Sequence, residues 1–177
     1  MGICFRWRLV AGVLAAALAA SGANKKPDKE QIRDKASSLV GKPAPDLVLP
    51  DLGGKQTRLS DSQGHAVLLV FWATWCPPCR SEMPNLAKLQ REAAEGGKEE
   101  VVLVAQDSPA KVRSFLKAKK LEAKCLVDES GAVFERFGAQ YIPKAFVIGQ
   151  DGTVLKFLFH KQSEDTFRQA LAAGLEH

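Results

Sequence analysis

The chain has 177 residues, of which 46% are hydrophobic and 25% charged, and its formal net charge is +5. This length fits one domain with a short appendage, and the composition is ordinary for a globular protein. The cations are scattered and form no run of five or six like charges, so the sequence gives no support for nucleic-acid binding.

The cysteine pattern excludes two further classes. The chain contains four cysteines at uneven spacings, and only one pair lies close together in sequence: Cys4, Cys76, Cys79 and Cys125. A disulfide-rich scaffold would need more evenly distributed cysteines in a smaller chain, and a zinc site would need a second Cys or His pair. We therefore expect neither a disulfide framework nor a metal site.

Residues 1–23 have the pattern of a secretory signal peptide. Arg6 and Arg8 form a basic start without acids, Leu9–Ala20 is an unbroken run of apolar or small residues, and small residues follow up to Ala23. The run is shorter than the ~20 residues that a membrane span needs. A cleaved signal is the preferred interpretation, and an uncleaved membrane anchor is the alternative.

A polar stretch separates this segment from the expected domain. Residues 24–42 carry few apolar side chains, so we predict a linker or extension that could contain a short helix over residues 29–39. The domain is predicted to cover residues 43–177. It opens with a β-hairpin formed by residues 47–49 and 57–59, followed by a buried central strand at the apolar run Ala66–Trp72.

The remaining elements alternate between helices and strands. A helix is predicted to start near Pro77, to be kinked by Pro84 and to end at Gly96-Gly97. The other expected elements are a strand at 101–105, a helix after Ser108-Pro109 with a basic outer side, a strand at 125–127, a helix at 132–137, strands at 145–148 and 153–159, and a last helix capped by Ser163. This order predicts an α/β fold with a mixed central sheet and helices on both faces.

Cys76 and Cys79 are the candidate catalytic residues. They flank Pro77 and Pro78 at the junction between the central strand and the following helix, and this spacing allows a Cys76–Cys79 disulfide. A helix N-terminus offers unpaired amides and a partial positive charge, which favour the reactive thiolate of Cys76. Cys79, one turn deeper, would resolve the mixed disulfide. Pro77 and Pro78 remove amide donors and stiffen the turn.

A Cys-x-x-Cys pair alone also fits a structural disulfide or a soft-metal site. Its place between a buried strand and a kinked helix favours redox chemistry over both. The segment Phe71–Pro84 resembles the active-site segment of the TlpA/ResA-like branch of the thioredoxin superfamily. Further matches are Gly41–Pro45, Ile142-Pro143 and Asp151-Gly152. The resemblance implies a thioredoxin-like fold and a thiol–disulfide oxidoreductase without a cofactor.

The resemblance also implies roles for individual residues. Pro143 would be a cis-proline facing the disulfide, with the backbone of Ile142 exposed for a substrate segment. Glu82 would influence the titration of the thiols, although an exposed helix residue is an equal alternative. Trp75 would shield Cys76. At Lys144, where relatives commonly carry threonine, a cation could bind an acidic partner or point away from the site.

Together these features predict an exported, periplasmic oxidoreductase, with anchorage to the inner membrane as an option. We expect it to act as a monomeric reductant of protein disulfides, for example in cytochrome c maturation, with a membrane thiol donor. Cys125 is expected to be an inert core residue, with a third redox thiol as the alternative. The competing functions are a peroxiredoxin-type thiol peroxidase and a copper-binding assembly factor.

Overall fold

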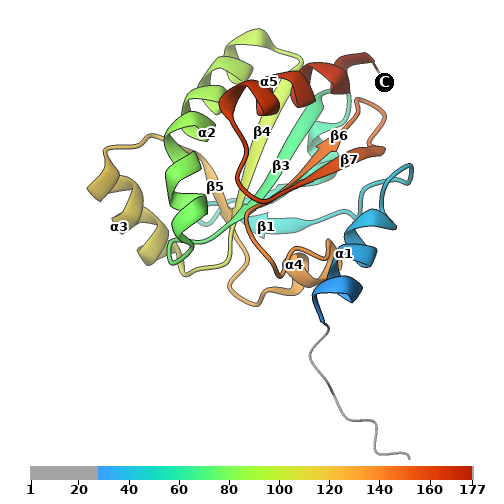
Figure 1. Ribbon diagram of the computed structural model, residues 1–177. Coiled ribbons are helices and arrows are strands. Elements are labelled where there is room, and N and C mark those ends of the chain that lie inside the picture. Colours follow the sequence, from blue (N-terminus) through green and yellow to red (C-terminus); the bar gives the residue numbers. More distant parts are fainter. Residues whose placement is uncertain (1–27, 177) are drawn as a thin grey trace, which may run out of the picture.

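The computed structural model describes residues 28–176, so the predicted signal peptide lies outside the described part of the chain. A five-stranded sheet forms its centre, in the order β5-β4-β3-β6-β7 (Figure 1). The strands are β3 (Ala66–Trp72), β4 (Glu99–Ala105), β5 (Cys125–Val127), β6 (Lys144–Ile148) and β7 (Val154–Phe159). β3 runs parallel to β4 and antiparallel to β6. The predicted mixed sheet in a thioredoxin-like α/β fold is thereby confirmed.

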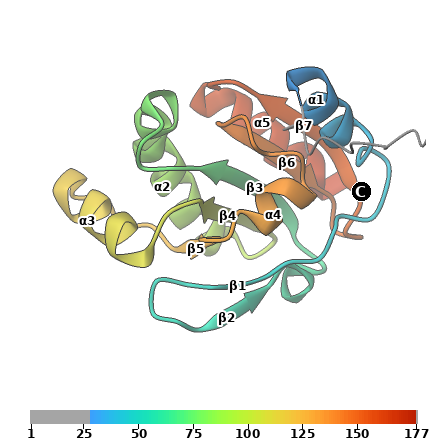
Figure 2. The same ribbon diagram turned by 90° about the horizontal axis from the view of Figure 1, so that it is seen from below.

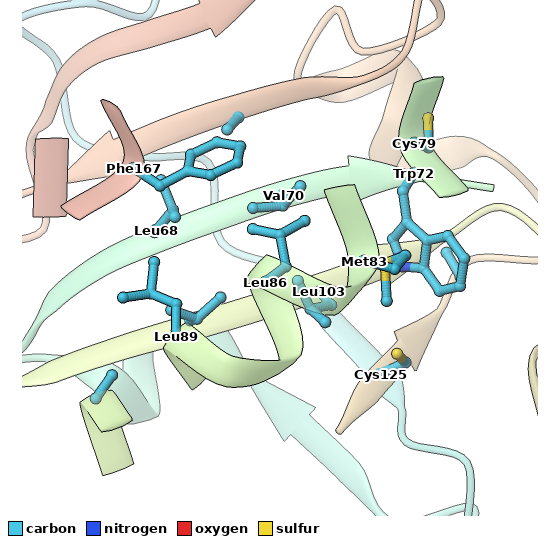
Figure 3. Close-up of a cluster of buried hydrophobic side chains, with 14 of the residues drawn as sticks. Leu68, Val70, Trp72, Cys79, Met83, Leu86, Leu89, Leu103, Cys125 and Phe167 are labelled. Atoms are coloured by element: carbon cyan, nitrogen blue, oxygen red, sulfur yellow. The ribbon is translucent and has the colours of Figure 1, made fainter. Parts of the chain in front are cut away.

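The central strand has the predicted limits, and all seven of its residues are buried. Such burial is typical of a strand that is covered on both faces. On one face it packs against α2 (Pro77–Gly96), α3 (Pro109–Lys119) and α5 (Glu164–Ala173). Figure 3 shows this core, where Met83, Leu86 and Leu89 of α2 lie over Val70 and Leu103.

The opposite face is covered by α1 (Lys29–Ser37), α4 (Ala132–Arg136) and the hairpin of β1 (Val48–Pro50) and β2 (Gln56–Arg58). Figure 2 shows the hairpin and α2 on opposite sides of the sheet. The predicted N-terminal hairpin is confirmed, with Leu49 paired to Thr57. Short 3-10 turns follow at Leu59–Ser62 and Gly174–Glu176.

Helix α1 shows that part of the expected linker is packed on the domain. Ile32 and Ala36 are buried although most of the helix is polar. They are four residues apart and therefore share one helix face. After the helix, Gly41 donates a backbone hydrogen bond to Val154, whose own amide donates to Lys42. The short helix anticipated within this stretch therefore forms over Lys29–Ser37, and turns connect it to the rest of the domain.

Helix α2 begins directly after Cys76, contains Cys79 and continues past Pro84. Pro84 lies inside the helix, as predicted. It has no amide hydrogen, so it cannot donate a helical bond to the carbonyl of Arg80. Gly97 ends the helix in the left-handed region, with φ 76°, and its amide donates to Ala93. Across residues 28–176, no helix combines the length and apolarity needed to cross a bilayer.

Candidate active site

The two candidate catalytic cysteines lie at the junction of β3 and α2 and form a disulfide, with their Cα atoms 5.3 Å apart. Cys76 is the N-cap of α2 and is 3% exposed, whereas Cys79 is 1% exposed. The predicted pair is therefore brought together, and both residues are buried.

The amide pattern at the start of α2 directs one donor to Cys76. Pro77 and Pro78 occupy the first two helical positions and have no N–H. The first amide donor of the helix is therefore that of Cys79, and it lies 3.3 Å from the Sγ atom of Cys76. An amide donor and the positive end of a helix both stabilise negative charge on a sulfur. This arrangement suits Cys76 for carrying a thiolate once the disulfide is reduced.

The predicted cis-proline faces the same sulfur. The Ile142–Pro143 peptide bond is cis. The carbonyl oxygen of Ile142 lies 3.9 Å from Cys76 Sγ, Pro143 is buried and Ile142 is half-buried. The loop before β6 and the start of α2, which are distant in sequence, thus form the two sides of the site.

The two tryptophans before the disulfide have different environments. Trp72 is fully buried, and its ring centroid lies 5.5 Å from that of Phe115. It belongs to the core, as expected. Trp75 is 61% exposed next to Cys76. Most of its indole is accordingly available to a partner at the rim of the site.

Glu82 is buried, so the interpretation of this side chain as an exposed helix residue is wrong. It follows Cys79 by three residues in α2, and both side chains face the core. One of its carboxylate oxygens accepts a hydrogen bond from the amide of Gln162, which lies between β7 and α5. Burial raises the pKa of Glu82 from 4.5 to about 7, while the Gln162 amide and the charge of Lys161 lower it. Glu82 can consequently exchange a proton near neutral pH.

Lys144 was expected either to bind an acidic partner or to point away from the site, and its burial supports the second interpretation. Its side chain is 1% exposed, and its Nζ atom donates a hydrogen bond to the carbonyl of Gly138. Side chains alternate along β6, and Ala145 belongs to the core beneath α2, so Lys144 points to the opposite face of the sheet. A cation after the cis-proline suggested a surface contact, but strand alternation directs it inward.

One residue of this edge was missed by the sequence analysis. Asp107 follows β4, is 7% exposed and accepts a 2.7 Å hydrogen bond from the amide of Thr74. β3 and β4 are parallel, so the segments that follow their carboxyl ends meet at one edge of the sheet. An acid two residues after the end of β4 was the only available signal. Asp107 holds the loop that leads into Cys76.

The remaining described cysteine takes no part in the disulfide. Cys125 is a free, buried thiol in the core beneath α2 (Figure 3). Burial raises its pKa to about 12, so the thiol stays protonated and unreactive. Within residues 28–176, no three His, Cys, Asp or Glu side chains gather as a metal site would require.

Comparisons with known proteins agree with this geometry. Residues 39–173 match the Redoxin family. The thiol-disulfide oxidoreductase ResA of Bacillus thuringiensis subsp. konkukian is 34% identical over 132 residues, which cover 75% of this chain and 76% of that protein.

Solved structures give the same picture. A secreted Mycobacterium tuberculosis disulfide oxidoreductase, homologous to E. coli DsbE, is 26% identical with a TM-score of 0.62, and the match covers 72% of this chain and 95% of that one. The exposed lipoprotein thioredoxin Etrx1 of Streptococcus pneumoniae is 31% identical with a TM-score of 0.63, covering 73% and 99%. The chain therefore belongs to the Redoxin family, as a thioredoxin-like thiol–disulfide oxidoreductase similar to ResA.

Proposed function

We propose that the protein reduces disulfides of exported proteins, with Cys76 as the attacking thiol and Cys79 as the resolving thiol. The observation that carries this assignment is the direction of the Cys79 amide, which points at Cys76 Sγ while that sulfur faces the Ile142 carbonyl. Of the two cysteines in the disulfide, Cys76 has both the stabilising donor and a neighbouring backbone edge on which a substrate segment could lie.

The reaction proceeds by two thiol–disulfide exchanges. The Cys76 thiolate attacks a substrate disulfide, so that a mixed disulfide forms and one substrate sulfur leaves as a thiolate. Cys79, deprotonated, then attacks the Sγ atom of Cys76 and releases the second substrate sulfur. The substrate gains two electrons and the Cys76–Cys79 disulfide forms. An external dithiol, which we place at the membrane, must then reduce this disulfide.

Three kinds of residue support substrate handling in this proposal. The backbone of Ile142, beside cis-Pro143, would pair with an extended substrate segment around its cysteine. The exposed indole of Trp75 would contact apolar side chains of that segment. The carboxyl of Glu82 is buried on the same helix as Cys79 and would exchange a proton with the thiols, since its pKa is raised to about 7.

Export is supported by the signal-like residues 1–23 and by the two structural neighbours described as secreted and as an exposed lipoprotein. We propose that the mature protein acts as a monomer in the periplasm, and that its substrates include an apocytochrome c. Fractionation followed by N-terminal sequencing tests both export and cleavage.

An insulin-reduction assay tests the reaction. The wild type should show turnover that is lost in Cys76→Ser and retained in the matched control Cys125→Ser. Equal turnover of wild type and Cys76→Ser would refute the assignment. Rapid peroxide consumption would favour a peroxidase, and stoichiometric Cu(I) retention against a chelator would favour a copper-binding factor.

Trapping identifies the partner. Cys79→Ser cannot resolve the mixed disulfide, so it should hold substrates covalently through Cys76. The redox potential tests the direction of electron flow. A reductant should lie nearer to the ~−270 mV of thioredoxin than to the ~−120 mV of the oxidant DsbA.

A further inference from the structure

Lys144 is a buried lysine that has no carboxylate partner among the residues that the structure describes. Within the described residues, its Nζ atom bonds to the Gly138 carbonyl and lies 5.1 Å from the ring centroid of Phe159 and 5.9 Å from that of Phe157. Burial also lowers the pKa of Lys144 to about 8. Taking an ammonium group out of water is costly, so an apolar side chain would fill this place with less penalty. What the lysine adds is the bond to Gly138.

That bond closes the loop which carries the cis-proline. The loop begins at Gly138, just after α4, and ends where β6 starts at Lys144. Near its end, the Ile142 carbonyl lies 3.9 Å from Cys76 Sγ. The ammonium therefore ties the first residue of the loop to the residue directly behind the cis-proline.

The Gly138 end of this tie is itself fixed. Gly138 has φ 61°, a conformation that favours glycine. A Cβ atom there would lie 2.9 Å from the carbonyl oxygen of Ile32 and 3.0 Å from the amide nitrogen of Ala36, both in α1. The next amide, that of Ala139, donates a 2.7 Å bond to the carbonyl of Phe134 in α4. Lys144 thus anchors the loop to a rigid corner between α1 and α4.

We propose that Lys144 is a positioning residue for thiol–disulfide exchange, which holds the loop Gly138–Pro143 so that the Ile142 backbone stays opposite Cys76. This inference rests on the proposed function. Lys144 touches neither sulfur, because it lies on the opposite face of the sheet from α2. Its loss should consequently affect substrate binding and leave the chemistry of the disulfide unchanged.

The test compares Lys144→Met and Lys144→Thr with Lys156→Met, which removes an exposed lysine from the neighbouring strand. For a disulfide-containing peptide, both Lys144 variants should raise KM about tenfold, as loss of one hydrogen bond from a charged donor would do. Their kcat should change little, and Lys156→Met should match the wild type in both constants. The redox potential should be the same in all four proteins.

Hydrogen exchange at the loop amides gives a second readout that does not depend on turnover. Faster exchange at residues 139–142 in the Lys144 variants, with unchanged exchange in β3, would support the proposal. Folded variants with wild-type KM and wild-type exchange would overturn it. Loss of folding in both variants at 25 °C would also overturn it, since Lys144 would then support the whole domain. Absence of turnover in the wild type would instead refute the proposed function. Hydrogen exchange would then still test whether Lys144 holds the loop in place.

Discussion

Replacement of Glu82 by glutamine should stabilise the oxidised protein at alkaline pH. Burial raises the pKa of Glu82 from 4.5 to about 7, so between these values the folded protein keeps a proton that the unfolded chain has released. The free energy of unfolding of the wild type must therefore fall as the pH rises through this window. At 1.36 kcal/mol per pH unit, the loss reaches about 3 kcal/mol above pH 7. The glutamine side chain cannot ionise, and its amide oxygen can still accept the hydrogen bond from the Gln162 amide.

Urea denaturation at pH 4 and pH 8 measures this effect. Glu82→Gln should differ little from the wild type at pH 4 and should be more stable by about 3 kcal/mol at pH 8. Glu95→Gln is the matched control, because Glu95 is an exposed acid on the same helix. If the two variants respond alike to pH, or if Glu82→Gln is less stable at pH 8, the assignment of a buried, protonated carboxyl is refuted.

Three further predictions concern the core, the loop before Cys76 and the free thiol. Phe71→Ala should lower the free energy of unfolding by about 3–5 kcal/mol in urea titrations, because a fully buried ring is lost. Asp107→Ala should lower the free energy of unfolding by about 1–3 kcal/mol and reduce kcat/KM for insulin, since the Thr74 amide loses its acceptor. Asp107→Asn keeps an acceptor oxygen, so it should restore most of the stability and most of kcat/KM. Cys125 should not react with a thiol reagent at pH 8 until the oxidised protein is unfolded, and rapid labelling of the native protein would contradict its burial.

The elements with strong local patterns were predicted well. The run Ala66–Trp72 is apolar throughout and bounded by turn residues, which is enough to fix a central strand. The limits of α2 follow from two prolines at its start and a glycine pair at its end. A short helix over residues 29–39 was anticipated, but the packing of α1 on the domain was not, because Ile32 and Ala36 are the only buried hydrophobic residues among those described in the helix. A polar composition suggested a linker although one apolar face was sufficient for packing.

In the candidate site too, the motif residues were easier to predict than the environment of the ionisable side chains. Cys76 and Cys79 were predictable from their spacing and their place before a helix, and cis-Pro143 was implied by the family resemblance. The environment of an ionisable side chain depends on neighbours that are distant in sequence. Glu82 meets the Gln162 amide, 80 residues away, and Asp107 meets the Thr74 amide, 33 residues away. No local pattern distinguishes these side chains from exposed ones.

The end of β7 and the segment that leads from it to α5 contact both Glu82 and Lys144, which lie on opposite faces of the sheet. At the end of β7, the ring of Phe159 lies beside the ammonium of Lys144, and three residues later the amide of Gln162 binds Glu82. The Gln162 side chain donates to the Phe159 carbonyl at 2.8 Å, which joins the two contacts. Burial moves both pKa values toward neutrality, that of Glu82 up to about 7 and that of Lys144 down to about 8. The formal net charge of the chain, which counts both groups as ionised, therefore does not describe the charge state of these two buried side chains near neutral pH.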